Sequence, residues 1–211
     1  MSVTLNWLGL SCFKISTKIG EREAEIVTDP YNPNVGLKLP RSLSADIVTI
    51  SRNDDAHGFI EGVGGNYFLM KTPGEVEVKQ IFIYGIQPKQ SAGAEPIIFY
   101  RFEIGDISVA HLGDSSCEFS AEELEQLEDV DILLVPVGAS AVKQTVDLVN
   151  QIQPRIVIPM YYKIPGVKAE LLPLEKFLKE LGVKSETMPK LKIAKKDLPQ
   201  DNMRVIILER S

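Results

Sequence analysis

Two short, uninterrupted apolar runs limit the fold of this chain more than any other feature. They span residues 132–137 and 156–160, and runs of this kind are typical of strands that are covered on both faces. Apolar residues recur with helical spacing at 120–127, 142–152 and 172–181. Strands that alternate with helices in this way predict an α/β fold in which helices cover the sheets.

The first half of the chain is predicted to consist mainly of strands. Turn residues such as Gly9, Gly20 and the pair Gly105-Asp106 separate its apolar or alternating segments. Ser120, with Glu123 three residues later, suits the start of the first helix as a capping box. The predicted strands span 3–8, 12–17, 24–28, 47–51, 67–71, 76–85, 96–104, 107–110 and, at the end of the chain, 204–209.

The composition is that of an ordinary globular protein and predicts one domain over residues 1–211. Apolar residues make up 44% of the chain and charged residues 25%, which gives no reason to expect disorder. The formal charge of −6 argues against a generally basic surface for nucleic acid. Asp197 and Asp201 follow at once after the lysine-rich stretch 190–196, so we interpret that stretch as a solvated, charged loop.

The N-terminal segment and the cysteines bear on where the protein works. Residues 1–13 contain no basic leader with an apolar core, and the apolar run at 132–142 is too short to span a bilayer. We therefore expect a soluble, cytoplasmic protein that does not bind membranes. Cys12 and Cys117 make no disulfide framework, and we interpret both as small core residues.

A set of motifs at predicted strand ends carries the strongest functional signal. In order and spacing the set resembles the small hydrolase-like members of the metallo-β-lactamase superfamily, especially the branch similar to L-ascorbate-6-phosphate lactonase. The resemblance covers nearly the whole chain. Its parts are Trp7-Leu8-Gly9-Leu10-Ser11-Cys12-Phe13, Thr28-Asp29-Pro30-Tyr31, the segment 45–57, Pro73-Gly74-Glu75-Val76-Glu77, His111-Leu112-Gly113-Asp114 and Ile158-Pro159-Met160-Tyr161-Tyr162-Lys163.

The resemblance implies a four-layer αββα sandwich of two mixed sheets flanked by helices, with a metal site at one edge of the paired sheets. The strands that end near Ser51 and His111 should then converge on that edge. The family signature at this edge is Ser-His-x-His-x-Asp-His, and its last His is the one ligand that this chain keeps. The four ligand positions of the signature are occupied by Arg52, Asp54, Ala56 and His57.

Two further ligand positions of the family are changed. Tyr161 stands where the family has a His after Ile-Pro-Met, and Leu10 stands where a His often follows Trp-Leu-Gly. Asp114 matches the carboxylate that bridges two metal ions in the family. Zinc hydrolysis needs about three protein ligands per ion and an open position, so the resemblance implies that a dinuclear zinc centre does not form.

A weakened mononuclear site is the alternative. If a metal is retained, its ligands would be His57, Asp114 and Asp54, with Glu75 or His111 approaching from neighbouring strand ends. We expect no cofactor other than weakly bound zinc.

Arg52 places a fixed cation where the family has a neutral ligand, and a guanidinium would oppose the binding of a divalent ion. Without the ions, Asp54 and Asp114 would repel each other unless a cation satisfied them. We therefore predict that Arg52 lies within hydrogen-bonding distance of Asp54 or Asp114. We assign no catalytic residue, and the vestigial site is predicted to comprise Arg52, Asp54, Asp55, His57, Asp114 and Tyr161.

The same residues also allow structural interpretations. His57 and His111 would then be packed and hydrogen-bonded, and Asp114 would accept hydrogen bonds from loop N–H groups. Glu75 and Glu77 share one strand face and are interpreted as solvated charges. The loop at 30–40 either borders the site or lies on the surface.

Three functions follow from these patterns. We favour a non-catalytic binding or scaffolding protein that has lost most metal ligands. The alternative is an enzyme that hydrolyses a small ester, lactone or phosphorylated substrate with one loosely bound metal or none. A third hypothesis is a subunit of an assembly, such as a homo-oligomer, since Tyr161 and Tyr162 beside Lys163 suggest exposed aromatics. The expected partner is a small molecule or a protein, and neither nucleic acid nor membrane.

Overall fold

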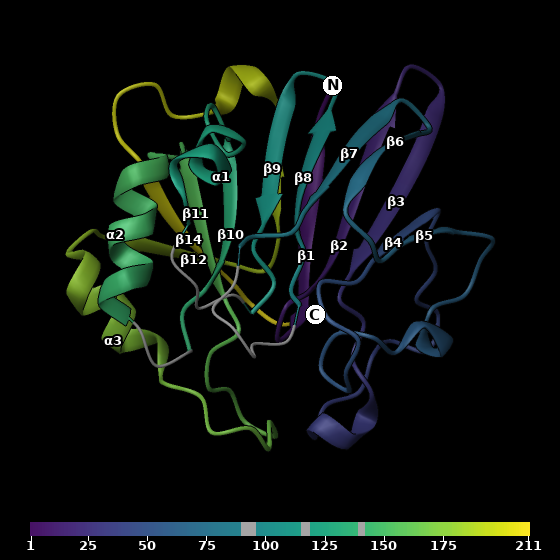
Figure 1. Ribbon diagram of the computed structural model, residues 1–211, viewed down its shortest axis with the longest axis horizontal. Coiled ribbons are helices and arrows are strands. Elements are labelled where there is room, and N and C mark those ends of the chain that lie inside the picture. Colours follow the sequence, from purple (N-terminus) through teal and green to yellow (C-terminus); the bar gives the residue numbers. More distant parts are fainter. Residues whose placement is uncertain (90–95, 115–118, 139–141) are drawn as a thin grey trace.

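Two mixed β-sheets pack face to face in the computed structural model, which describes residues 1–89, 96–114, 119–138 and 142–211 (Figure 1). The predicted α/β class with two mixed sheets is confirmed. The α-helices of the described residues lie on one outer face, against the larger sheet. Within these described ranges, no helix is long and apolar enough to cross a membrane.

The smaller sheet has six strands in the order β13-β1-β2-β3-β4-β5. The strands β3, β4 and β5 run parallel to one another, so their carboxyl ends lie at the same edge of the sheet. The bounds are β1 (Val3–Gly9), β2 (Cys12–Ile19), β3 (Arg22–Thr28), β4 (Ile47–Thr49), β5 (Phe68–Met70) and β13 (Leu191–Ile193).

The larger sheet has eight strands in the order β12-β14-β11-β10-β9-β8-β7-β6. Its strands β9, β10, β11, β14 and β12 are parallel, and the antiparallel strands β6, β7 and β8 complete it. The bounds are β6 (Gly74–Val78), β7 (Ile81–Ile86), β8 (Phe99–Ile104), β9 (Ile107–His111), β10 (Ile132–Pro136), β11 (Ile156–Met160), β12 (Ser185–Met188) and β14 (Arg204–Leu208). The α-helices are α1 (Ala121–Glu125), α2 (Val142–Ile152) and α3 (Leu174–Leu181).

The main core lies between the two sheets and continues under the helices. Both β10 and β11 are buried at every position, because the smaller sheet covers one face and apolar residues of α2 and α3, such as Val149 and Phe177, cover the other. This double cover confirms the interpretation of the two apolar runs. The predicted capping box at Ser120 and Glu123 is also confirmed.

A second apolar cluster covers the outer face of the smaller sheet. Alternation along a strand separates the two faces: Ile26 and Ile47 belong to the main core, whereas Val27 and Val48 belong to the outer cluster. Irregular chain from residues 31–45 and 56–69 packs on this face. In the described residues this layer contains the short 3-10 helices η1 (Pro33–Val35) and η2 (Ile60–Gly62) where the family resemblance led us to expect α-helices.

Two predictions of secondary structure were wrong in detail. The segment 76–85 is not one strand, because the chain reverses between β6 and β7 at Lys79 and Gln80, whose φ angles are +52° and +67°. Neither residue is the Gly or Asn that usually marks such a turn. The lysine-rich stretch 190–196 is not a simple loop, since it contains β13 and the start of the 3-10 helix η3 (Lys195–Asp197).

Candidate functional site

The motifs of the resemblance meet at the carboxyl ends of the parallel strands. The Ser11 hydroxyl donates to the carbonyl of Gly113 at 3.3 Å, and the Tyr161 amide donates to the carbonyl of Leu10 at 3.1 Å. These bonds join the β1–β2 turn to the chain that follows β9 and β11. The predicted convergence is therefore confirmed, although β4 ends at Thr49, two residues before Ser51.

Asp29 ties the end of β3 to the chain that leads into Arg52. Its side chain is fully buried, and its two oxygens accept hydrogen bonds from the Ser51 amide at 2.6 Å and the Ser51 hydroxyl at 2.7 Å. Burial raises the pKa of Asp29, against the opposing charges of His111 and His57 and the bonds from Ser51. Asp29 belongs to the motif Thr28-Asp29-Pro30-Tyr31, but its structural role was not predicted from the sequence.

His111 is a packed, hydrogen-bonded residue, as its structural interpretation predicted. Its Nε2 donates to the carbonyl of Ser11 at 2.7 Å, and its Nδ1 accepts from the Gly113 amide at 3.2 Å. Both ring nitrogens are thus engaged in the neutral form. Burial lowers the pKa of His111 despite the nearby Asp29 carboxyl, which favours the neutral ring whose two nitrogens brace the strand ends.

Arg52 and Asp114 form an ion pair at these strand ends. The Nη2 of Arg52 lies 3.0 Å from Oδ1 of Asp114, with side-chain exposures of 27% and 12%. The predicted contact of Arg52 is confirmed for Asp114. However, Oδ1 receives no hydrogen bond of acceptable angle, and Nε of Arg52 is buried without a hydrogen-bond partner. The contact is therefore mainly Coulombic.

Asp54 and His57 form a second pair within one loop. Nδ1 of His57 lies 2.7 Å from Oδ1 of Asp54, which also accepts a bond from the Ala56 amide at 2.8 Å. Burial favours a higher pKa for Asp54, but the bond and charge of His57 outweigh it and lower the pKa. For His57, burial favours a lower pKa, but the bond to Asp54 and the charges of Asp29 and Asp114 raise it.

Tyr161 lies over His57. Their rings are stacked, with centroids 5.5 Å apart and an interplanar angle of 27°, and burial raises the pKa of the Tyr161 phenol. The neighbouring Tyr162 is buried, with its ring 5.0 Å from that of Trp7. The expectation that both aromatics are exposed was wrong, because Tyr162 is buried and Tyr161 is half-buried against both apolar clusters.

Asp55 is not brought into the cluster. Its side chain is exposed and accepts a 3.3 Å bond from the Asn34 side chain, so the prediction that it joins the vestigial site was wrong. The reason is local, because the turn that directs Asp54 toward His57 directs the next side chain outward. The loop at 30–40 borders this turn, since Pro30 accepts a bond from the Phe59 amide at 2.7 Å.

The donor atoms of the cluster do not fit a dinuclear zinc centre. His57 offers Nε2, which is buried and has no hydrogen-bond partner in the described ranges, and Asp114 offers an oxygen that already faces a guanidinium. Glu75 is exposed on β6, together with Glu77, as their interpretation as solvated charges predicted. Among the described residues, no three His, Cys, Asp or Glu side chains are grouped as a metal would require.

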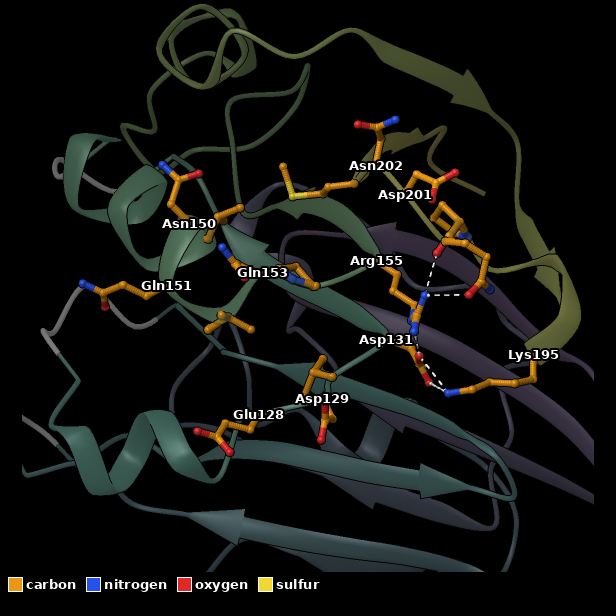
Figure 2. A pocket seen from close by; sticks show the side chains of 17 residues that line it. Glu128, Asp129, Asp131, Asn150, Gln151, Gln153, Arg155, Lys195, Asp201 and Asn202 are labelled. Atoms are coloured by element: carbon orange, nitrogen blue, oxygen red, sulfur yellow. Dashed lines mark hydrogen bonds and ion pairs between the residues drawn. The ribbon is translucent and has the colours of Figure 1, made fainter.

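A separate depression of about 1110 Å³ lies at the opposite, amino ends of β10, β11 and β14 (Figure 2). Asp131 is buried at its floor, and both of its oxygens lie 2.9 Å from Nζ of Lys195. Nε of Arg155 lies 3.4 Å from the same carboxylate, and the Ser108 amide donates to it at 3.0 Å. Sequence analysis did not identify this buried acid, which the segment 190–196 helps to neutralise.

Comparisons with known proteins agree with the geometry of the strand ends. Residues 4–161 match the family described as the beta-lactamase superfamily domain. A UPF0173 protein of Pyrococcus furiosus is 28% identical, in a match that covers 83% of this chain and 89% of the relative. A UPF0173 metal-dependent hydrolase of Methanosarcina mazei is 25% identical, and the match covers 75% of this chain and 82% of the relative.

A solved structure shows the same similarity. The crystal structure of a Thermotoga maritima protein, described as a Zn-dependent hydrolase of the metallo-β-lactamase superfamily, superimposes with a TM-score of 0.79. It is 28% identical in sequence, and the match covers 98% of this chain and 100% of that one.

Proposed function

Because the chain belongs to the beta-lactamase superfamily, with its match over residues 4–161, we propose that it is a binding protein that has exchanged the zinc chemistry of this fold for a guanidinium-centred site. The relatives named metal-dependent hydrolases make metal use the coarse expectation for the family. Our proposal departs from it on one observation, which is the 3.0 Å contact between Arg52 and Asp114.

The contact supports the proposal because of its charge. A guanidinium stays protonated at any physiological pH and makes no dative bond to a metal. A divalent ion bound by Asp114 would have to displace the guanidinium or tolerate its repulsion. Arg52 thus serves as the counter-charge that metal ions would otherwise provide.

The test is metal content measured together with hydrolysis. Protein purified without chelator is assayed for bound zinc, and for hydrolysis of p-nitrophenyl acetate and bis(p-nitrophenyl) phosphate with and without added zinc. We expect less than one zinc per chain and no zinc-dependent turnover. The matched variant carries Arg52→His, Asp54→His, Ala56→Asp and Tyr161→His and should gain zinc binding. Two zinc ions per wild-type chain with turnover would refute the proposal.

A mononuclear hydrolase is the second candidate, and one observation favours it. Among the described residues, Nε2 of His57 and Oδ1 of Asp114 are both buried without hydrogen bonds, so both could be ligands if an ion displaced Arg52 from Asp114. Asp54 would be the third ligand. One zinc per chain that is lost in both His57→Ala and Asp114→Ala, with hydrolysis lost in parallel, would favour this candidate over the binding protein.

A further inference from the structure

We propose that the cluster at the strand ends is a receptor for a small oxyanion, a carboxylate or phosphate group, which binds at the free Nε edge of Arg52. The inference rests on the proposed function, since it requires that Arg52 and not a metal ion supplies the positive charge. It concerns this chain's own residue at a position where the family signature has a ligand.

Among the described residues of the cluster, one charged hydrogen-bond donor has no acceptor. Asp29 accepts two bonds from Ser51, and Asp54 accepts bonds from His57 and the Ala56 amide. These two carboxylates are therefore satisfied within the protein. Nε of Arg52, in contrast, is buried and finds no acceptor among the described residues.

The unused donor calls for an oxygen acceptor. A buried N–H without a partner costs free energy, and the cost is larger when the group is charged. The guanidinium presents two edges in one plane, and a carboxylate or phosphate oxygen suits either edge. Asp114 contacts Nη2, and the Nε–H on the same edge of the guanidinium has no acceptor among the described residues. A charged acceptor is favoured over a neutral carbonyl, because charge-assisted hydrogen bonds are about twice as strong.

The location allows a ligand to arrive from solvent. The Arg52 side chain is partly exposed although its Nε is buried, so an oxyanion from solvent would meet the guanidinium and reach Nε by shifting this one side chain. The phenol of Tyr161 lies close enough to interact electrostatically with Arg52 and Asp114. Its hydroxyl makes no hydrogen bond within the part of the chain that the structure describes, so it can donate to a second oxygen of the same ligand.

The experiment observes the Nε–H group directly. Cross-peaks of arginine Nε–H groups in ¹⁵N-labelled protein are followed while sodium phosphate or sodium acetate is added at constant ionic strength. Sodium chloride and acetamide are the controls. We expect one saturable cross-peak shift with at least one of the two oxyanions, and the anion that causes it identifies the group that the site prefers. That cross-peak is assigned to Arg52 by its absence in Arg52→Lys.

The matched variant separates charge from geometry. Arg52→Lys keeps a cation beside Asp114 but has no Nε–H edge, so it should bind the oxyanion about tenfold more weakly. If Arg52→Lys does not fold, Tyr161→Phe replaces it and should weaken binding by a smaller factor, since it removes only one neutral donor.

Several results would overturn the inference. These are the absence of any saturable shift, an equal shift with chloride or acetamide, and unchanged affinity in Arg52→Lys. A protein that binds two zinc ions would refute the proposed function and this inference together. A metal-free protein that is silent to both anions would refute the inference alone.

Discussion

A carboxylate is neutralised at each end of the parallel strands, but the two ends do so with different numbers of partners. At the amino ends, Asp131 is buried against Lys195 and Arg155 and also accepts a backbone hydrogen bond from Ser108. At the carboxyl ends, Asp114 faces Arg52 alone among the ion pairs of the described residues, and neither partner is fully hydrogen-bonded.

The difference separates a structural ion cluster from an open one. Figure 2 shows Lys195 and Arg155 both directed at Asp131 from different segments. Two cations therefore neutralise the same carboxylate. The Arg52–Asp114 pair has no such redundancy. Unused hydrogen-bonding capacity is costly in a protein that only needs to fold, and we expect it where a ligand completes the arrangement.

Loss of Arg52 should give the largest effect. Arg52→Ala leaves Asp114 without its cation and should lower the free energy of unfolding by about 2–3 kcal/mol, below the ~3–5 kcal/mol of a fully buried pair because Arg52 is partly exposed. Urea unfolding with and without zinc is the measurement. Arg52→Lys and the exposed Arg41→Ala are controls that should stay near wild type. Unchanged stability of metal-free Arg52→Ala would contradict the role of Arg52 as counter-charge.

Asp29 should be the next most sensitive position. Asp29→Ala leaves the Ser51 amide and hydroxyl buried without acceptors and should cost about 2 kcal/mol. Asp29→Asn is the matched control, because its amide can accept from the Ser51 amide and donate to the hydroxyl. Thermal unfolding of the two variants compares them. Equal destabilisation would mean that the charge of Asp29, and not its hydrogen bonds, holds the strand ends together.

At the opposite end, Lys195→Ala should cost only about 1 kcal/mol. Lys195 is 45% exposed, and Arg155 and the Ser108 amide still face Asp131 after its removal. The double variant Lys195→Ala/Arg155→Ala should lose more than the sum of the single effects, because it leaves the buried carboxylate without a cation. Additive losses in urea unfolding would refute the redundancy that distinguishes this end.

The smallest effect should be the pH dependence of the Asp54–His57 pair. The lowered pKa of Asp54 means that its contribution is present above 3.8 and is lost as the pH falls through the folded-state value. The raised pKa of His57 means that its contribution is fully present below 6.5 and is lost as the pH rises through the folded-state value. The pair therefore stabilises most between these limits.

The measurement for this pair is the difference in unfolding free energy between wild type and Asp54→Asn at pH 5.5 and pH 9. We expect the difference to be smaller at pH 9 than at pH 5.5, because His57 loses its proton as the pH rises through its raised pKa. If the difference does not change with pH, a hydrogen bond to the neutral imidazole accounts for the contribution of the pair to stability.

The sequence by itself determined most of the strand and helix pattern and that the motifs ending in Ser51 and His111 meet at one sheet edge. The apolar runs at 132–137 and 156–160 require cover on both faces. In the other strands, the alternation of apolar residues decides which side chains face the core between the sheets. The expectation of an Arg–Asp contact also came from the sequence alone, through the family positions that the resemblance assigns to residues such as Arg52.

Only the tertiary structure decided how individual charges are paired. The turn at 52–57 directs Asp54 toward His57 and Asp55 toward Asn34, and no sequence pattern distinguishes two adjacent aspartates. Asp131 lies far from Lys195 in sequence but is neutralised by it, because β-sheet topology brings the two segments together. Charge pairing depends on distances of a few ångströms between segments that are far apart in the sequence. Burial depends on local periodicity, and the sequence therefore predicted burial better than charge pairing.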